Sequence, residues 1–140
     1  MTTIAYDGIT LATDSLITSG SLKFGYCEKI FKLKKGRYLA CAGSLEILPL
    51  VVAWFNGGPE VDLVDTDKIT GIVVNGDGSA MDISNELRVF PACIPWSGGT
   101  GEEIAMTAMR CGKNAAEAVA MACELDINSG GDVQSVKIRK

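Results

Sequence analysis

The stretch TTIAYDGITLATD (residues 2–14) holds two short runs rich in β-branched residues, separated by an Asp-Gly pair. β-Branched and aromatic side chains favour strands. Asp-Gly is favoured in the two-residue turns of hairpins because both of its residues tolerate a positive φ. The pattern predicts strands over residues 2–6 and 9–13, paired antiparallel around Asp7-Gly8. A β-hairpin with a threonine at its N-terminal end is therefore the first element expected.

The sequence that follows predicts a second hairpin and one helix. A polar turn, Lys-Lys-Gly-Arg, joins strands expected over residues 26–33 and 38–43. The apolar segment 45–55 is long enough for a buried helix. Pro49 must lie in the first turn of that helix, because a proline deeper inside would remove a backbone hydrogen bond. Residues 56–59, Asn-Gly-Gly-Pro, end the helix.

Two capping boxes mark helix starts in the second half, Thr100 with Glu103 and Asn114 with Glu117. The expected elements there are strands over residues 69–74 and 80–90, helices over residues 100–110 and 114–125, and a last strand over residues 133–138. The order of strands, helix, strands, two helices and strand predicts one α+β domain, residues 1–140. In such a domain two sheets pack together and the helices lie outside them.

The composition excludes several classes of protein. Hydrophobic residues make up 47% of the 140 residues and charged residues 21%, as expected for a folded globule. A formal charge of −4 and the lack of a Lys/Arg block argue against nucleic-acid binding. No apolar run is long enough to span a membrane, and no basic region of a signal peptide precedes the first strand. The five cysteines are scattered without a C-x-x-C pair, which predicts reduced thiols, no zinc site and a cytoplasmic location.

The sequence contains no histidine. Ser-His-Asp triads, Cys-His dyads and H-E-x-x-H zinc sites are therefore excluded. If the protein is an enzyme that needs a base, the base must be a carboxylate, a lysine or the amino terminus of the chain.

Thr2 offers a nucleophile and a base in one residue. Removal of Met1 would leave Thr2 with a free α-amino group, whose pKa of about 7.7–8.0 suits a base near neutral pH. In a strand over residues 26–33, Lys29 would share a face with apolar neighbours, and a charge placed there needs a partner or a purpose. Asp14 is a candidate partner. A buried Lys29 would lower the pKa of a neighbouring hydroxyl or amine and so favour nucleophilic attack.

Six motifs together resemble one known family. They are TTI (2–4), ATD (12–14), EKIFKL (28–33), LACAG (39–43), SGG (97–99) and DINSG (126–130). In this order they resemble motifs of proteasome β-subunits, in which SGG is a turn just before a helix. They are closer still to HslV, the peptidase subunit of a bacterial two-component ATP-dependent protease. The resemblance covers most of the chain.

The resemblance implies roles for individual residues. Thr2 would be the nucleophile, Lys29 the charge that tunes it, and Asp14 the carboxylate that holds Lys29. A network that orients the amino group and a proton-relaying water would consist of Asp126, Ser129 and Ser97. The backbone N–H of Ala40 would be the oxyanion donor, and the first specificity pocket would be lined by Cys27, Tyr38 and Ala42. No metal ligand is implied.

The resemblance also implies a fold and an assembly. The fold would be a four-layer αββα sandwich of two mainly antiparallel sheets, the N-terminal-nucleophile hydrolase fold. Family members have two helices between the fourth strand and the next hairpin. Here only residues 45–55 fit, so the fold is expected to be trimmed by about one helix. The family's assembly is a ring-shaped homo-oligomer enclosing its active sites, with an ATPase unfoldase as a further partner.

Three functions are compatible with these observations. The leading one is a threonine-type endopeptidase that cleaves peptides or unfolded proteins without a cofactor. The second is a catalytically silent ring or scaffold component that keeps Met1. The third is a hydrolase of small amides with the same N-terminal chemistry. The mass of the mature chain separates the first two.

Overall fold

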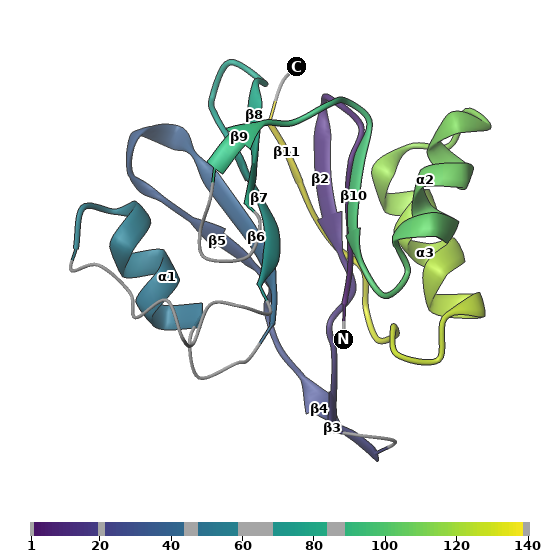
Figure 1. The fold of residues 1–140 in the computed structure, drawn as a ribbon. Helices are drawn as coiled ribbons and strands as arrows, with labels where there is room; N and C mark the ends of the chain where they lie inside the picture. Colours follow the sequence, from purple (N-terminus) through teal and green to yellow (C-terminus); the bar gives the residue numbers. More distant parts are fainter. Residues whose placement is uncertain (1, 20–21, 44–47, 59–68, 84–88, 139–140) are drawn as a thin grey trace.

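The computed structural model describes residues 2–19, 22–43, 48–58, 69–83 and 89–138. Within these residues the chain is α+β, as predicted (Figure 1). Two antiparallel sheets lie face to face. Helices α2 (Glu102–Arg110) and α3 (Ala115–Leu125) cover the outer side of the first sheet, and α1 (Leu48–Phe55) covers the outer side of the second. The order of layers is therefore helix, sheet, sheet, helix.

The first sheet is built around the predicted N-terminal hairpin. Its strands, in the order β10-β1-β2-β11, are β10 (Trp96–Gly99), β1 (Thr3–Tyr6), β2 (Thr10–Thr13) and β11 (Gln134–Lys137). Asp7 and Gly8 make the turn. Asp7 Oδ1 accepts hydrogen bonds from the amides of Ile9 and Thr10, and Gly8 has φ 96°. Asp7 Oδ2 also accepts the Ala115 amide at 2.8 Å, which ties the start of α3 to this hairpin.

The second sheet contains the other strands expected from the first two-thirds of the sequence. In order they are β5 (Ile30–Lys32), β6 (Tyr38–Ala42), β7 (Thr70–Val74), β8 (Ala80–Ile83) and β9 (Val89–Pro91). The predicted polar turn between β5 and β6 is the 3-10 turn η1 (Lys34–Gly36). A separate two-stranded ribbon, β3 (Leu16–Ser19) and β4 (Leu22–Tyr26), projects beyond the sandwich at the end where the N-terminus lies (Figure 1).

Three apolar clusters hold the layers together. The cluster between the sheets includes Ile4, Tyr6 and Leu11 from the first sheet and Ala40 and Ile72 from the second. A second cluster joins α1 to the outer face of the second sheet, and a third joins α2 and α3 to the first sheet through Ala5 and Ala12. Alternate residues of β1 therefore face the other sheet and the helices, as strand geometry requires.

The predicted single strand over residues 26–33 is wrong. β4 ends at Tyr26 and β5 begins only at Ile30, so residues 27–29 lie between two strands. The face assigned to Lys29 is wrong for the same reason. Phe31 and Leu33 pack in the cluster beneath α1, whereas Lys29 reaches toward the N-terminal end of the first sheet. The alternation rule applies only within a continuous strand.

Two further expectations need correction. Ser97-Gly98-Gly99 is not a turn but part of strand β10, which pairs antiparallel with β1. The capping box at Thr100 is also wrong, because Gly101 is the N-cap of α2 and no side chain caps it. By contrast, the capping box of Asn114 and Glu117 at the start of α3 is confirmed in both of its hydrogen bonds.

Some expectations concern residues that the structure does not describe. Pro49 lies in the first turn of α1, as predicted, but the predicted start of that helix at residue 45 lies outside the described residues. The same holds for most of the stretch 57–68, on which the expectation of a trimmed fold depends. The predicted strand over residues 80–90 proves to be β8 and β9, paired antiparallel. None of the helices in the described part of the chain is long and apolar enough to cross a membrane.

Candidate active site

The two sheets bring Thr2 and Lys29 together at the N-terminal end of β1. Thr2 directly precedes β1, and Lys29 directly precedes β5 of the other sheet. Lys29 Nζ donates a hydrogen bond of 2.8 Å to Thr2 Oγ1. The exposed fractions are only 5% for Thr2 and 3% for Lys29. A hydroxyl thus lies against an ammonium group that is shielded from solvent.

Asp14 compensates the buried charge of Lys29. Asp14 Oδ1 accepts from Lys29 Nζ at 2.8 Å, and the side chain of Asp14 is fully buried. The ammonium also donates to the carbonyl of Leu16 at 2.6 Å. Asp14 receives two backbone amides as well, Thr3 N on Oδ1 and Gly130 N on Oδ2. Such additional hydrogen bonds are what a buried ion pair needs to offset its desolvation.

A second polar network lies on the helix side of β1. The hydroxyls of Thr3 and Ser129 are 2.6 Å apart, and Ser129 Oγ donates to Asp126 Oδ2 at 2.6 Å. Thr100 Oγ1 donates to the same oxygen at 2.6 Å. Asp126 is the residue that ends α3. The network therefore connects the strand next to Thr2 with the loop that follows α3.

The hydrogen bonds around Asp126 favour its charged form. Burial alone would raise the pKa of this carboxyl, but the bonds from Ser129, Thr100 and the Asn128 amide together outweigh burial and lower the pKa below the ordinary 3.8. A carboxylate with a depressed pKa in the folded state contributes stability above its unfolded pKa, and this contribution is lost as the pH falls through the folded value.

Asp126→Asn should therefore lower the Tm most near neutral pH. The difference in Tm between wild type and variant should shrink as the pH falls below about 4, where the unfolded carboxyl takes up its proton. Thermal unfolding between about pH 7 and pH 2.5 measures this. The control is Asp132→Asn, which removes an exposed carboxylate without touching Ser129 or Thr100. A Tm difference that does not change with pH would contradict the assignment.

The hydroxyl of Ser97 does not join the Asp126 network among the hydrogen bonds of the described residues. Ser97 lies on β10 opposite Ala5, and its hydroxyl donates to the carbonyl of Glu102 at 2.8 Å. Thr100 supplies the second hydroxyl to Asp126 instead. Thr3 and Thr100 are thus site residues that sequence reasoning missed. Thr3 adjoins Thr2 in the sequence, but no local pattern points to Thr100, because its partner is 26 residues away.

The backbone of Gly99 packs closely against the carbonyl group of Thr2. The φ of Gly99 is 92°, and a Cβ at this position would lie 1.8 Å from the carbonyl oxygen of Thr2. Only glycine fits this backbone conformation and this close approach without displacing Thr2.

Gly99→Ala should displace Thr2 and abolish whatever activity depends on it. The matched control is Gly112→Ala, since Gly112 has a similar φ of 96° but open space where its Cβ would lie. Both variants carry the backbone strain, which costs about 1–2 kcal/mol, but only Gly99→Ala adds the clash. Thermal unfolding and activity measured on both variants separate the two effects. Equal losses in the two variants would show that contact with Thr2 does not matter.

Ala40 is poorly placed to donate its N–H to an oxyanion. It lies in the middle of β6, opposite Ile30 of β5 and Ile72 of β7. In an antiparallel strand with neighbours on both sides, each backbone N–H is directed to one neighbour or the other. The last paired residue of β6 is Ala42, so Gly43 carries the first amide beyond this ladder.

Tyr38 lies at the far end of the sandwich from Thr2. It pairs with Val74, at the end of β7 that leads to the turn carrying Gly78. The hydroxyl of Tyr6, at the opposite end of β1 from Thr2, donates to the Gly78 carbonyl. Tyr38 therefore cannot share a pocket with the Thr2 hydroxyl, contrary to the sequence-based expectation. Ala42, four residues further along β6, lies at the other end of the same strand.

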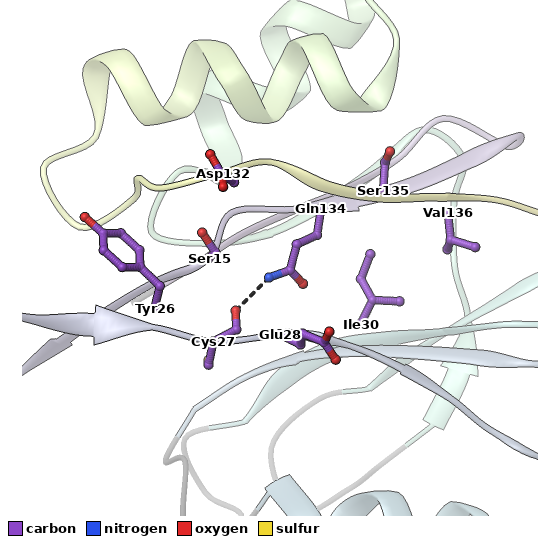
Figure 2. Close-up of a pocket in the computed structure, with 9 residues that line it drawn as sticks. All are labelled: Ser15, Tyr26, Cys27, Glu28, Ile30, Asp132, Gln134, Ser135 and Val136. Carbon is purple, nitrogen blue, oxygen red and sulfur yellow. Dashed lines mark hydrogen bonds between the residues drawn. The ribbon is translucent and has the colours of Figure 1, made fainter.

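Cys27 lines an open pocket between the edges of the two sheets (Figure 2). The cavity has a volume of about 580 Å³ and includes Ser15 and Cys27, which are close in sequence to Asp14 and Lys29. One further wall runs from the end of β4 to the start of β5, and the other is formed by β11 and the residues before it. The residues of these walls are Tyr26, Glu28, Ile30, Asp132, Gln134, Ser135 and Val136. Tyr38 and Ala42 are not part of this lining.

The thiols of Cys27, Cys41 and Cys123 are not activated. Burial raises the pKa of Cys27, with Asp14 adding to the rise and Lys29 opposing it. Burial also raises the pKa of Cys123 to about 11 and that of Cys41 to about 12. A thiol is a nucleophile only as the thiolate. The hydroxyl of Thr2 is therefore a better candidate nucleophile than these sulfur atoms.

Comparison with known proteins places the fold but not the activity. No protein-family model and no curated protein matches this sequence. Solved structures that share its fold include Thiobacillus denitrificans BPH, with a TM-score of 0.73 and 19% identity, and the same protein in complex with Epoxomicin, with a TM-score of 0.71 and 20% identity. Each match covers 97% of this chain and 96% of the other. The chain therefore has the fold of these structures over nearly its whole length.

Proposed function

We propose that this protein is a threonine-type peptidase of the proteasome β-subunit kind, with the N-terminal-nucleophile hydrolase fold and with Thr2 as its nucleophile. The observation that carries the proposal is the 2.8 Å contact between Lys29 Nζ and Thr2 Oγ1, both buried, in a protein without histidine. A hydroxyl beside a shielded positive charge loses its proton more readily than a free hydroxyl.

The proposed reaction has two halves. After Met1 is removed, the α-amino group of Thr2 accepts the hydroxyl proton as Thr2 Oγ1 attacks the carbonyl carbon of a peptide bond. The C–N bond then breaks, the leaving amine takes up the proton, and an ester on Thr2 remains. Water hydrolyses that ester with the amino group again acting as base. The ammonium group of Lys29 stabilises the negative charge that develops on Oγ1.

Two further observations support this function. The Asp126–Ser129–Thr3 network lies directly beside Thr2 and favours a charged carboxylate, which suits the positioning of an amino group. One of the structures with the same fold was solved in complex with epoxomicin, a proteasome inhibitor. No metal or organic cofactor is needed for the proposed chemistry.

The assembly is also a proposal. We infer a homo-oligomer, a ring in the family it resembles, with peptide or unfolded protein as substrate and an ATPase unfoldase as a further partner. The two-stranded ribbon of β3 and β4 is a candidate subunit contact, because the side chains of Leu22, Phe24 and Tyr26 on β4 are 62%, 71% and 67% exposed. Exposed apolar patches of this kind mark interaction sites. Native mass spectrometry gives the number of subunits.

The intact mass of the mature chain tests the catalytic proposal. The expected mass lacks Met1, and incubation with an acylating β-lactone should add one acyl group, which tandem mass spectrometry should locate on Thr2. A chain that keeps Met1 while it hydrolyses blocked peptides would contradict the proposal. A chain that keeps Met1 and hydrolyses nothing would favour the silent scaffold, and turnover of small amides only would favour the third function.

A further inference from the structure

Gln134 holds the segment that carries Lys29. Gln134 is the first residue of β11, on the edge of the first sheet. The backbone N–H of Lys29 donates to Gln134 Oε1 at 2.9 Å, and Gln134 Nε2 donates to the carbonyl of Cys27 at 2.7 Å. Figure 2 shows the second of these bonds crossing between the strand edges. One side-chain amide thus binds two backbone groups that flank Glu28.

The two hydrogen bonds of the Gln134 side chain are those that a residue of a neighbouring parallel strand would make. In a parallel sheet, one residue donates its N–H to the carbonyl before the opposite residue and accepts from the N–H after it. The amide of Gln134 does the same around Glu28. Residues 27–29 lie between β4 and β5 and belong to neither strand. The side chain therefore replaces a backbone partner where the regular ladder is interrupted.

The bonds matter because of where Lys29 points. Its ammonium group reaches Thr2, Asp14 and the Leu16 carbonyl from this same short segment. A backbone that shifts by a fraction of an ångström between Cys27 and Lys29 moves Nζ relative to Thr2 Oγ1. We propose that Gln134 is a positioning residue, which fixes the Lys29 backbone so that the ammonium stays on the Thr2 hydroxyl. Its catalytic consequence depends on the function proposed above.

The surroundings of Gln134 allow its effect on the position of Lys29 to be tested without unfolding the protein. Its side chain is half-buried at the wall of the 580 Å³ pocket rather than in an apolar cluster. Water entering from this pocket can therefore satisfy the Cys27 carbonyl and the Lys29 amide when the glutamine amide is absent. The fold should then survive, but water does not hold the two groups at a fixed separation.

Gln134→Met tests the proposal, because methionine has a similar length and no hydrogen-bonding amide. With lysine labelled at Cε, the NMR signal of Lys29 should shift or broaden in this variant. The kcat for a blocked peptide should fall about 10- to 100-fold, with KM unchanged. The control is Lys137→Met, a substitution of an exposed residue at the other end of β11 that is not part of the pocket lining; its Lys29 signal and kcat should equal those of wild type.

Gln134→Glu adds a rescue by protonation. A neutral carboxylic acid can accept from Lys29 N and donate to the Cys27 carbonyl, as glutamine does, whereas a carboxylate cannot donate. The ratio of variant to wild-type kcat should therefore rise as the pH falls through the pKa of the new carboxyl. An unchanged Lys29 signal in Gln134→Met would overturn the proposal, whether or not the protein is active. Wild-type protein inert toward peptides would remove the proposed function alone, leaving the Lys29 signal as the test of positioning.

Discussion

Thr2→Ala should lower kcat for a short blocked peptide by a factor on the order of 10⁵–10⁶. The substitution removes the hydroxyl that accepts from Lys29 Nζ and that would form the ester. The amino group and the charge of Lys29 are left in place, but neither can replace a nucleophile. The effect should appear in kcat rather than in KM, because the hydroxyl contributes to the transition state and not to the binding of distant parts of the substrate.

The controls for Thr2→Ala test whether the variant stays folded and whether the Thr2 hydroxyl is the nucleophile. Thr2→Ser keeps a hydroxyl on the same carbon and should retain most of the activity. The Tm of Thr2→Ala should fall only modestly, because Lys29 keeps Asp14 and the Leu16 carbonyl as acceptors and the lost hydrogen bond contributes about 1 kcal/mol. Hydrolysis that continues at the wild-type rate in Thr2→Ala would place the nucleophile elsewhere or identify a contaminating protease.

Local sequence patterns predicted the elements that local interactions determine. Asp7-Gly8 folds as predicted because the Asp7 side chain bonds the amides of Ile9 and Thr10, both within three residues. The capping box of Asn114 and Glu117 is correct for the same reason. The cost of burying a charge made Asp14 a candidate partner of Lys29. Only the family resemblance placed Thr2 beside them, because the separations of these three residues in the sequence carry no local signal.

Several of the failed predictions involve partners that are distant in the sequence. Residues 26–33 alternate like one strand, yet the ladder is interrupted where Gln134, 105 residues beyond Lys29, supplies its amide. The glycines at 98 and 99 suggest a turn, but they lie in strand β10. Glycine is needed there because neighbouring groups leave no room for a Cβ. A Cβ on Gly98 would lie 2.5 Å from the Trp96 ring, and one on Gly99 would meet the Thr2 carbonyl. Close approach and turn formation both select glycine, so composition cannot separate them.

Lys29→Met should be the most damaging single substitution for stability at the site. Methionine fills much of the same volume, but it leaves the Asp14 carboxylate fully buried without its cation. Removing one partner of a buried ion pair costs about 3–5 kcal/mol. Chemical denaturation measures this loss. The control is Lys32→Met, on the exposed side of β5, which should change the unfolding free energy by less than about 0.5 kcal/mol.

The loss of activity in Lys29→Met must be distinguished from this loss of stability. Losing one preorganised charge at a reacting oxygen costs about 10²–10³-fold in kcat, and this should be measured at a temperature where the variant is still folded. Adding Asp14→Asn to Lys29→Met removes the buried carboxylate charge that Lys29 no longer compensates. The double variant should then be more stable than the sum of the two single losses predicts, while its kcat stays as low as that of Lys29→Met.

The double-mutant cycle separates the two roles of the lysine. Recovery of stability without recovery of kcat means that Asp14 neutralises the Lys29 charge in the fold, whereas the contact of 2.8 Å with Thr2 Oγ1 is what Lys29 contributes to the reaction. Recovery of both would mean that Lys29 acts only by keeping the site folded. In that case the hydroxyl of Thr2 would need no neighbouring charge, and the ammonium would lose its proposed part in catalysis.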